Sequence, residues 1–263
     1  MPKSILVLAV IAISSLAWGE QRTQQDGNAP DTSACSFVYS SGPAATFTRY
    51  CLSVNGNIIQ FDSPQGFEFI RAGSVDEGYG ICDFDGGPKA YFDYGADFSN
   101  NWGATVVSVP NATTRKFVRL TNDGIWQLTQ TIKQIKATAM GPGSVKITMA
   151  LKNLTGIGRD AFLLRFADVD ANATIFDDEF DATLNSAFGS DPGFSFGLGL
   201  TNNTFTFEHA AFTMNFVVVP DPCNPFANAN AGPFVGDGGL VQIYAITVPA
   251  GATKTVNMTY KPI

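Results

Sequence analysis

The stretch Val145-Lys-Ile-Thr-Met-Ala-Leu-Lys152 decides the fold class, because apolar and polar side chains alternate along its whole length. A period of two is that of a β-strand with one buried and one solvated face. Residues 126–133 alternate in the same way, except that Gln130 interrupts the apolar side, and Gly141-Pro-Gly143 separates the two runs. Two alternating runs around a glycine and proline turn predict an antiparallel hairpin.

The rest of the chain from residue 35 onward has the same character. Phenylalanine, valine, isoleucine and threonine, which favour strands, are interrupted by glycine, proline and asparagine, which favour turns. Residues 240–248 and 253–260 predict a second hairpin, and only residues 177–188 could form a short helix. We therefore expect an all-β fold over residues 35–263. It would be one domain, an antiparallel β-sandwich of two packed sheets with many short strands, with a large closed barrel as the alternative.

The amino terminus predicts export. Residues 1–19 combine Lys3, an apolar run and the small-x-small site Ala17-Trp-Gly19, which is the pattern of a signal peptide. Residues 20–34 contain almost no large apolar side chains and predict a disordered leader. No later stretch is long and apolar enough to span a membrane. We expect a secreted protein, extracellular or periplasmic.

The charge balance limits the partners. The chain has 16 basic and 23 acidic residues, and cleavage would remove Lys3 and no acid, which moves the net charge from −7 to −8. An acidic chain without a lysine- or arginine-rich run argues against nucleic acid and anionic lipid. Cations, glycans and other extracellular or envelope components remain. No phosphate-binding glycine motif occurs, and a single histidine without a Cys-x-x-Cys pair argues against zinc. We expect no nucleotide and no haem either.

Four cysteines stand at positions 35, 51, 82 and 223, an even number that predicts two disulfide bonds in an exported chain. Three pairings are open. We favour Cys35–Cys51, which would join the first two strands, and Cys82–Cys223, which would tie distant parts of one domain.

The segment from Asp168 to Asp181 holds five aspartates and one glutamate in fourteen residues. Carboxylates this close repel one another unless a cation, protons or a basic partner compensates. The spacing resembles the calcium loop of EF-hand proteins, whose ligands come from places 1, 3, 5, 7 and 12. The matching residues are Asp168, Asp170, Asn172, Thr174 and Glu179.

Ala173 stands where that loop has its glycine, and no helix is evident before it. We therefore expect a calcium loop between strands, not an EF-hand. Because every candidate ligand is an oxygen, calcium is preferred over a transition metal. A solvated acidic loop without an ion is the alternative.

A second region mixes aromatic and acidic side chains, as sugar-binding surfaces often do. Its candidate ligand-binding residues are Tyr91, Asp93, Tyr94 and Trp102. Rings would stack on the apolar face of a sugar while carboxylates take its hydroxyls. Ordinary strand and turn chemistry is the competing interpretation.

No nucleophile, base and orienting group form a recognisable catalytic motif, and His209 is the only histidine. The sequence therefore favours a non-catalytic binding or surface module, calcium-stabilised and directed at carbohydrate. The first alternative is a carbohydrate-active enzyme, a hydrolase or lyase, that uses carboxylates of residues 168–181. The second is a purely structural protein of the cell surface.

Overall fold

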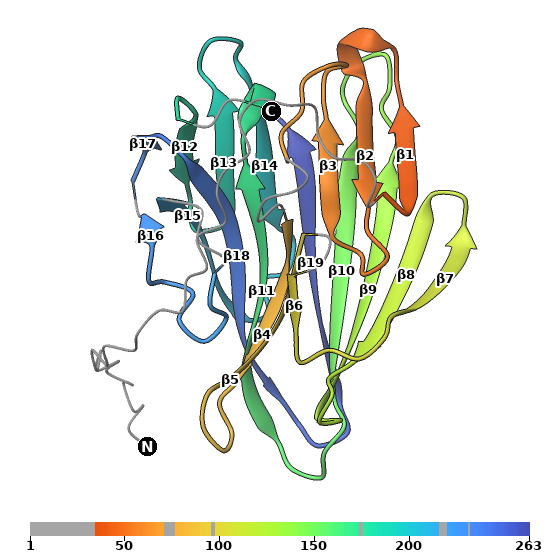
Figure 1. The fold of residues 1–263 in the computed structure, drawn as a ribbon, viewed down its shortest axis with the longest axis vertical. Coiled ribbons are helices and arrows are strands. Elements are labelled where there is room, and N and C mark those ends of the chain that lie inside the picture. Colours follow the sequence, from red (N-terminus) through yellow and green to blue (C-terminus); the bar gives the residue numbers. More distant parts are fainter. Residues whose placement is uncertain (1–34, 71–76, 96–97, 174–175, 216–219, 231) are drawn as a thin grey trace.

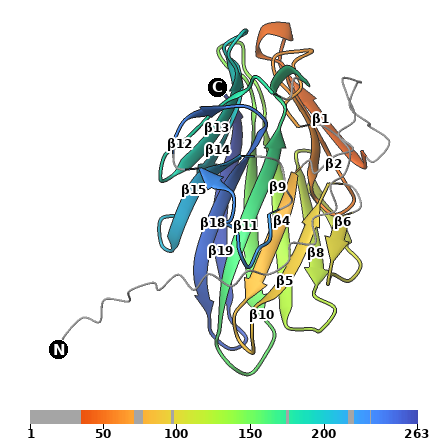
Figure 2. The same cartoon turned by 60° about the vertical axis from the view of Figure 1, so that its left-hand side comes forward.

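The computed structural model describes residues 35–263 with the exception of 71–76, 96–97, 174–175, 216–219 and 231. The expected signal peptide and leader lie outside the described residues. The described chain forms two large antiparallel sheets packed face to face (Figures 1 and 2). The predicted all-β sandwich is confirmed.

The described residues form three sheets. The first has nine strands in the order β17 (Phe234–Val235), β12 (Glu179–Ala182), β13 (Ser186–Asp191), β14 (Phe196–Asn202), β19 (Thr253–Pro262), β10 (Ser144–Asn153), β9 (Trp126–Ile135), β8 (Thr114–Leu120) and β7 (Val106–Asn111). The second has seven, in the order β16 (Ala229–Asn230), β15 (Glu208–Asn215), β18 (Gly238–Val248), β11 (Arg159–Val169), β4 (Glu77–Asp83), β5 (Lys89–Tyr94) and β6 (Phe98–Asn100). The third contains β1 (Phe37–Ser41), β2 (Thr48–Leu52) and β3 (Ile58–Asp62).

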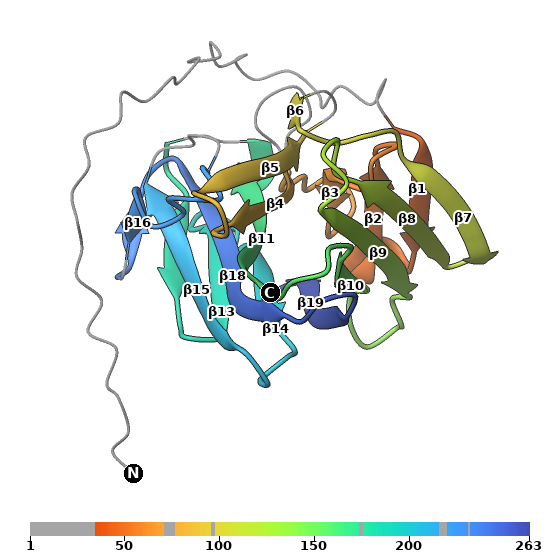
Figure 3. The same ribbon diagram turned by 90° about the horizontal axis from the view of Figure 1, so that it is seen from below.

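The small sheet lies against the β8–β9 part of the nine-stranded sheet, as the view from below shows (Figure 3). Phe37 of β1 meets Phe117 of β8 with ring centroids 5.9 Å apart. Both the small sheet and the seven-stranded sheet therefore cover the inner face of the nine-stranded sheet.

The hairpin predicted around the glycine and proline turn is confirmed as β9 and β10. Ile132 pairs with Ile147 and Leu128 with Leu151, and all four side chains are buried. Gln130, the polar interruption, also points inward, where its amide oxygen accepts a hydrogen bond from Arg165.

The second predicted hairpin is wrong. β18 pairs with β11 and β15 in one sheet, whereas β19 pairs with β10 and β14 in the other. The turn between them, closed by the bond from the Ala252 amide to the Pro249 carbonyl, carries the chain across the sandwich. Residues 177–188 form no helix, since this range holds β12 and the first half of β13, which pair as adjacent antiparallel strands. Apart from two three-residue 3₁₀ turns, Ala44–Thr46 and Ala171–Ala173, no helix occurs in the described residues.

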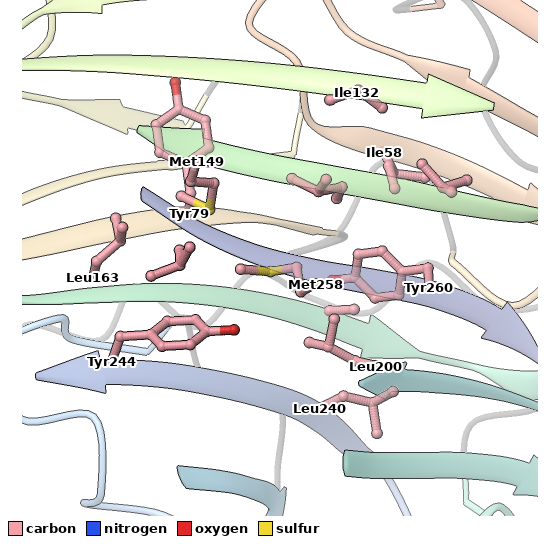
Figure 4. Close-up of a cluster of buried hydrophobic side chains, with 14 of the residues drawn as sticks. Ile58, Tyr79, Ile132, Met149, Leu163, Leu200, Leu240, Tyr244, Met258 and Tyr260 are labelled. Carbon is pink, nitrogen blue, oxygen red and sulfur yellow. The ribbon is translucent and has the colours of Figure 1, made fainter. Parts of the chain in front are cut away.

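The core between the sheets is built from inward side chains of both (Figure 4). The close-up labels aliphatic, methionine and tyrosine side chains: Ile58, Tyr79, Ile132, Met149, Leu163, Leu200, Leu240, Tyr244, Met258 and Tyr260. A second apolar cluster lies on the outer face of the seven-stranded sheet around Phe166 and Phe212. Many phenylalanines therefore pack outside the main core.

Both expected disulfides are present, in the favoured pairing. Cys35–Cys51 joins the segment before β1 to β2. Cys82–Cys223, whose ends are 141 positions apart in the sequence, fastens the segment that follows β15 onto the outer face of β4. No helix in the described part of the chain has the length and apolarity needed to cross a membrane.

Candidate functional site

The acidic segment begins where β11 ends. Phe166 belongs to the outer apolar cluster, and Asp168 and Asp170 follow it at alternate positions on the same face of the chain. Carboxylate oxygens of Asp168, Asp170 and Asp237 all lie within 4.8 Å of one another. Asp168 and Asp170 are each only 4% exposed. The structure therefore gathers three carboxylates, two of them buried, at one end of the seven-stranded sheet.

Backbone hydrogen bonds hold this acidic cluster in place. The Asp170 amide donates to the Phe69 carbonyl at 3.1 Å, and the Asn172 amide donates to the Glu68 carbonyl at 2.8 Å. Asn172 has a φ of 59°, a left-handed conformation that asparagine tolerates. The Asp178 carboxylate accepts from the Ala171 amide at 2.9 Å. Asp178 thus closes the loop that follows the two aspartates.

The structure distributes the other sequence-predicted ligands differently. Thr174 lies outside the described residues. Glu179 is the exposed first residue of β12, in the nine-stranded sheet, where it pairs with Ser190 and Val235. Asp237 takes a place in the cluster because β11 and β18 are neighbours, with Asp168 opposite Gly239. Sequence reasoning missed Asp237, since only this long-range pairing brings it to the cluster.

The donor set fits a hard divalent cation. All three groups are carboxylates, the ligand type that calcium prefers. The cluster also has an acidic neighbour in Glu68, which is buried. Burial raises the pKa of the Glu68 carboxyl well above its ordinary value, and the nearby Asp62 and Asp170 raise it further. A bound cation would relieve this concentration of negative charge.

An open cleft of about 390 Å³ is lined by residues that are close in sequence to the acidic cluster. Its lining residues come from β12, β13 and the segment around β17: Glu179, Phe180, Asp181, Phe188, Ser190, Pro233, Phe234 and Val235. Glu179 and Asp181 are exposed and alternate with the buried Phe180, so their side chains share the outer face of β12. The cleft thus combines two carboxylates with apolar walls.

Two connections link the cleft to the acidic cluster. Glu179 follows Asp178 directly, and Val235 is two residues from Asp237. The Gly236 amide donates to the Asp178 carbonyl at 2.9 Å, which ties both cleft walls together. The rim of the cleft is therefore continuous along the chain with the acidic cluster.

Phe188 provides a half-buried ring beside the two carboxylates. It pairs with Asp181 on one side and with Gly199 of β14 on the other. A Cβ atom at Gly199 would lie 3.0 Å from Cδ1 of this ring. Because Gly199 has no side chain, the Phe188 ring can pack directly against the backbone of β14.

The residues expected to form a sugar-binding surface lie inside the protein. Tyr91 and Tyr94 are fully buried and Trp102 is 8% exposed. Tyr94 donates from its hydroxyl to the Pro220 carbonyl at 3.0 Å. Asp93 is buried in an ion pair with Arg119, which joins the two large sheets. The three rings therefore pack within the protein and present no open face to a ligand.

His209 has structural partners. Its Nδ1 lies 2.9 Å from the Phe207 carbonyl oxygen and its Nε2 lies 2.8 Å from the side-chain oxygen of Asn185. These contacts occupy both ring nitrogens of His209 with partners inside the protein.

Comparison with known proteins identifies the fold. No protein family matches the chain, and no curated protein matches it in sequence. A bacterial glucoamylase determined with acarbose superposes with a TM-score of 0.60 at 11% identity, over 87% of this chain and 32% of its own. A putative aldose 1-epimerase from Escherichia coli gives 0.51 at 10% identity, over 86% and 99% of the two chains.

A galactose mutarotase-like protein from Lactobacillus casei gives a TM-score of 0.52 at 8% identity, over 86% of this chain and 100% of its own. The chain thus spans about a third of the glucoamylase and the full length of the mutarotase-like protein. Identities this low show a shared fold. The names of all three proteins refer to sugars.

Proposed function

We propose that this protein is an exported carbohydrate-binding module whose ligand site is the cleft on the outer face of β12 and β13. The observation that carries the proposal is the cleft itself, in which Glu179 and Asp181 stand beside the Phe188 ring. Carboxylates accept hydrogen bonds from sugar hydroxyls, and an aromatic ring packs on the apolar face of a sugar. The sugar chemistry of the structural neighbours supports the same ligand class.

One calcium ion held by Asp168, Asp170 and Asp237 would complete the site. It would neutralise the three carboxylates and fix the two chain segments that continue into Glu179 and Val235. The ion's role is structural: it sets the shape of the cleft rim. Disulfide bonds of the kind found here belong to oxidising compartments, which agrees with an exported protein.

Carbohydrate binding is tested by titrating neutral oligosaccharides, identified on a glycan array, into the mature protein. Charge-assisted hydrogen bonds contribute about 1.5–3 kcal/mol each, so Glu179→Gln with Asp181→Asn should weaken binding by about tenfold or more. Glu208→Gln, which removes one exposed carboxylate on β15, is the control outside the cleft. Equal affinity of the unaltered protein, the double variant and the control for the oligosaccharide would show that the cleft is not the binding site. The absence of any glycan ligand would favour the structural alternative.

The calcium part is tested by melting the protein in calcium and in chelator. At a calcium concentration one hundred times Kd, binding stabilises by about 2.7 kcal/mol, or roughly 5–10 °C for a domain of this size. Asp168→Asn with Asp170→Asn should abolish the difference. An unchanged midpoint in the unaltered protein would contradict a calcium site.

A carbohydrate-active enzyme is the second candidate, favoured by the pair of carboxylates on one face of β12. Residues at alternate strand positions lie about 7 Å apart at their Cα atoms, and glycoside hydrolases use two carboxyl groups about 5–9.5 Å apart. The enzyme would be supported over the binding module if the protein released reducing ends from a bound glycan and Glu179→Gln abolished this release. Binding without any product would support the non-catalytic module.

A further inference from the structure

Five neighbouring strands of the nine-stranded sheet contain no acidic residue. These strands are β19, β10, β9, β8 and β7. The whole chain has 23 acidic and 16 basic residues, so a region this size without a carboxylate departs from its composition. The inner face of β8, β9, β10 and β19 packs in the core, whereas β7 has no buried residue. The outer face of all five strands is open to solvent.

Four exposed lysines form a row across this outer face. Lys133 of β9 is the direct cross-strand partner of Lys146 of β10. Lys116 of β8 is diagonal to Lys133, because Lys133 pairs with Thr114. Lys261 of β19 is likewise diagonal to Lys146, which pairs with Thr259. At a strand spacing of about 4.8 Å, the lysine row spans roughly 14 Å.

Nothing in the described part of the chain neutralises the lysine row. None of its four lysines belongs to an ion pair between described residues. Like charges directly opposite each other destabilise a sheet, and Lys133 faces Lys146 in this way. The protein therefore keeps an arrangement that costs stability, which indicates a use for the positive charge outside the folding of the chain.

Hydroxyl groups lie between the lysines. Thr131 pairs with Thr148 and also with Lys116, so threonine and lysine side chains are interleaved on the outer face. No aromatic ring is exposed there, since Phe117, Trp126 and Tyr260 all point inward and are buried. Bases of single-stranded nucleic acid need such rings to stack on, whereas sugar rings bearing acidic groups need cations and hydroxyls.

We infer that this face binds an acidic polysaccharide, a linear chain of sugars that carry carboxylate or sulfate groups, laid along the lysine row. Charge complementarity selects the ligand, and the threonine hydroxyls make hydrogen bonds to the sugar hydroxyls. The inference does not rest on the cleft: a neutral oligosaccharide would bind beside β12, while the acidic chain would bind across β8, β9, β10 and β19.

The test measures binding of polygalacturonate and of heparin to the mature protein, with dextran as the neutral polymer. Four released counterions give a slope of about −3 in a plot of log affinity against log salt. Lys133→Gln with Lys146→Gln should weaken binding by about tenfold and leave the protein at least as stable, because a repulsion is removed. Lys136→Gln with Lys254→Gln removes the same charge outside the row and should change affinity by less than about twofold.

Three results would overturn the inference. One is equal loss in the two double variants, which would indicate a general effect of net charge. Another is tighter binding of single-stranded DNA than of either acidic polysaccharide at equal charge. The third is no binding of either polymer even at low salt. Glu179→Gln with Asp181→Asn should leave acidic polysaccharide binding undiminished, so failure of the cleft proposal remains distinguishable from failure of this one.

Discussion

Replacing Arg165 by methionine is expected to destabilise the protein severely. Arg165 and Glu77 are both fully buried, and their ion pair lies between the two large sheets. The guanidinium donates to the Glu77 carboxylate at 2.7 Å, to the Gly56 carbonyl at 3.1 Å and to the side chain of Gln130. It therefore connects the seven-stranded sheet, the nine-stranded sheet and the turn before β3.

The expected loss is about 3–5 kcal/mol, because the substitution leaves an uncompensated carboxylate in the core. For a domain of this size that corresponds to a melting temperature lower by roughly 10 °C. Burial already raises the pKa of Glu77 above 4.5, and Arg165 is the largest influence that lowers it. In Arg165→Met the pKa of Glu77 should rise further.

The stability of Arg165→Met should depend on pH. A carboxyl group whose pKa is raised by folding destabilises the protein above its folded pKa, and this cost fades as the pH falls toward the unfolded value. Arg165→Met should therefore recover stability relative to the unaltered protein as the pH is lowered toward 4.5. Urea unfolding across this range measures both effects, with Glu77→Gln and Arg165→Met combined as the control. A loss under about 1 kcal/mol that does not vary with pH would refute the reasoning.

Three further changes have defined outcomes. Burial raises the pKa of Asp62 from 3.8 to about 6, although Arg49 lies 3.5 Å away and lowers it. Asp62→Asn should therefore be more stable than the unaltered protein by up to about 3 kcal/mol above pH 7, and the difference should fade as the pH falls below about 4. Loss of the disulfide between Cys82 and Cys223, which closes 141 residues, should cost up to about 5 kcal/mol in chemical denaturation. Gly199→Ala, with a Cβ 3.0 Å from the Phe188 ring, should weaken oligosaccharide binding without unfolding the protein, as titration and circular dichroism can show.

Local features of the sequence predicted the strands well. Alternation around the glycine and proline turn gave the β9–β10 hairpin, because the pattern reports which face of a strand is buried. The same pattern failed for β18 and β19, since alternation does not specify which sheet a strand joins. The turn residues at Pro249 are no guide either, because the same kind of turn can join two strands of one hairpin or carry the chain from one sheet to the other.

Parts of the acidic cluster and the whole lysine row could not be predicted from the sequence, because both depend on which strands pair with one another. Asp168 and Asp170 are close in sequence, but Asp237 reaches them only through the pairing of β11 with β18. The lysine row is assembled from single lysines on four strands, so it never appears as a basic run. Trp102 illustrates the opposite error, because this ring, which stands among acids in the sequence, is buried over the guanidinium of Arg119 in the ion pair between the sheets.

The most direct test of the proposed function is amide hydrogen exchange with and without a saturating neutral oligosaccharide. We expect slower exchange at residues 178–191 and 233–237, around the cleft and the acidic cluster. Slower exchange confined to the β4–β5 region, or no change anywhere in a protein that binds the sugar, would contradict it.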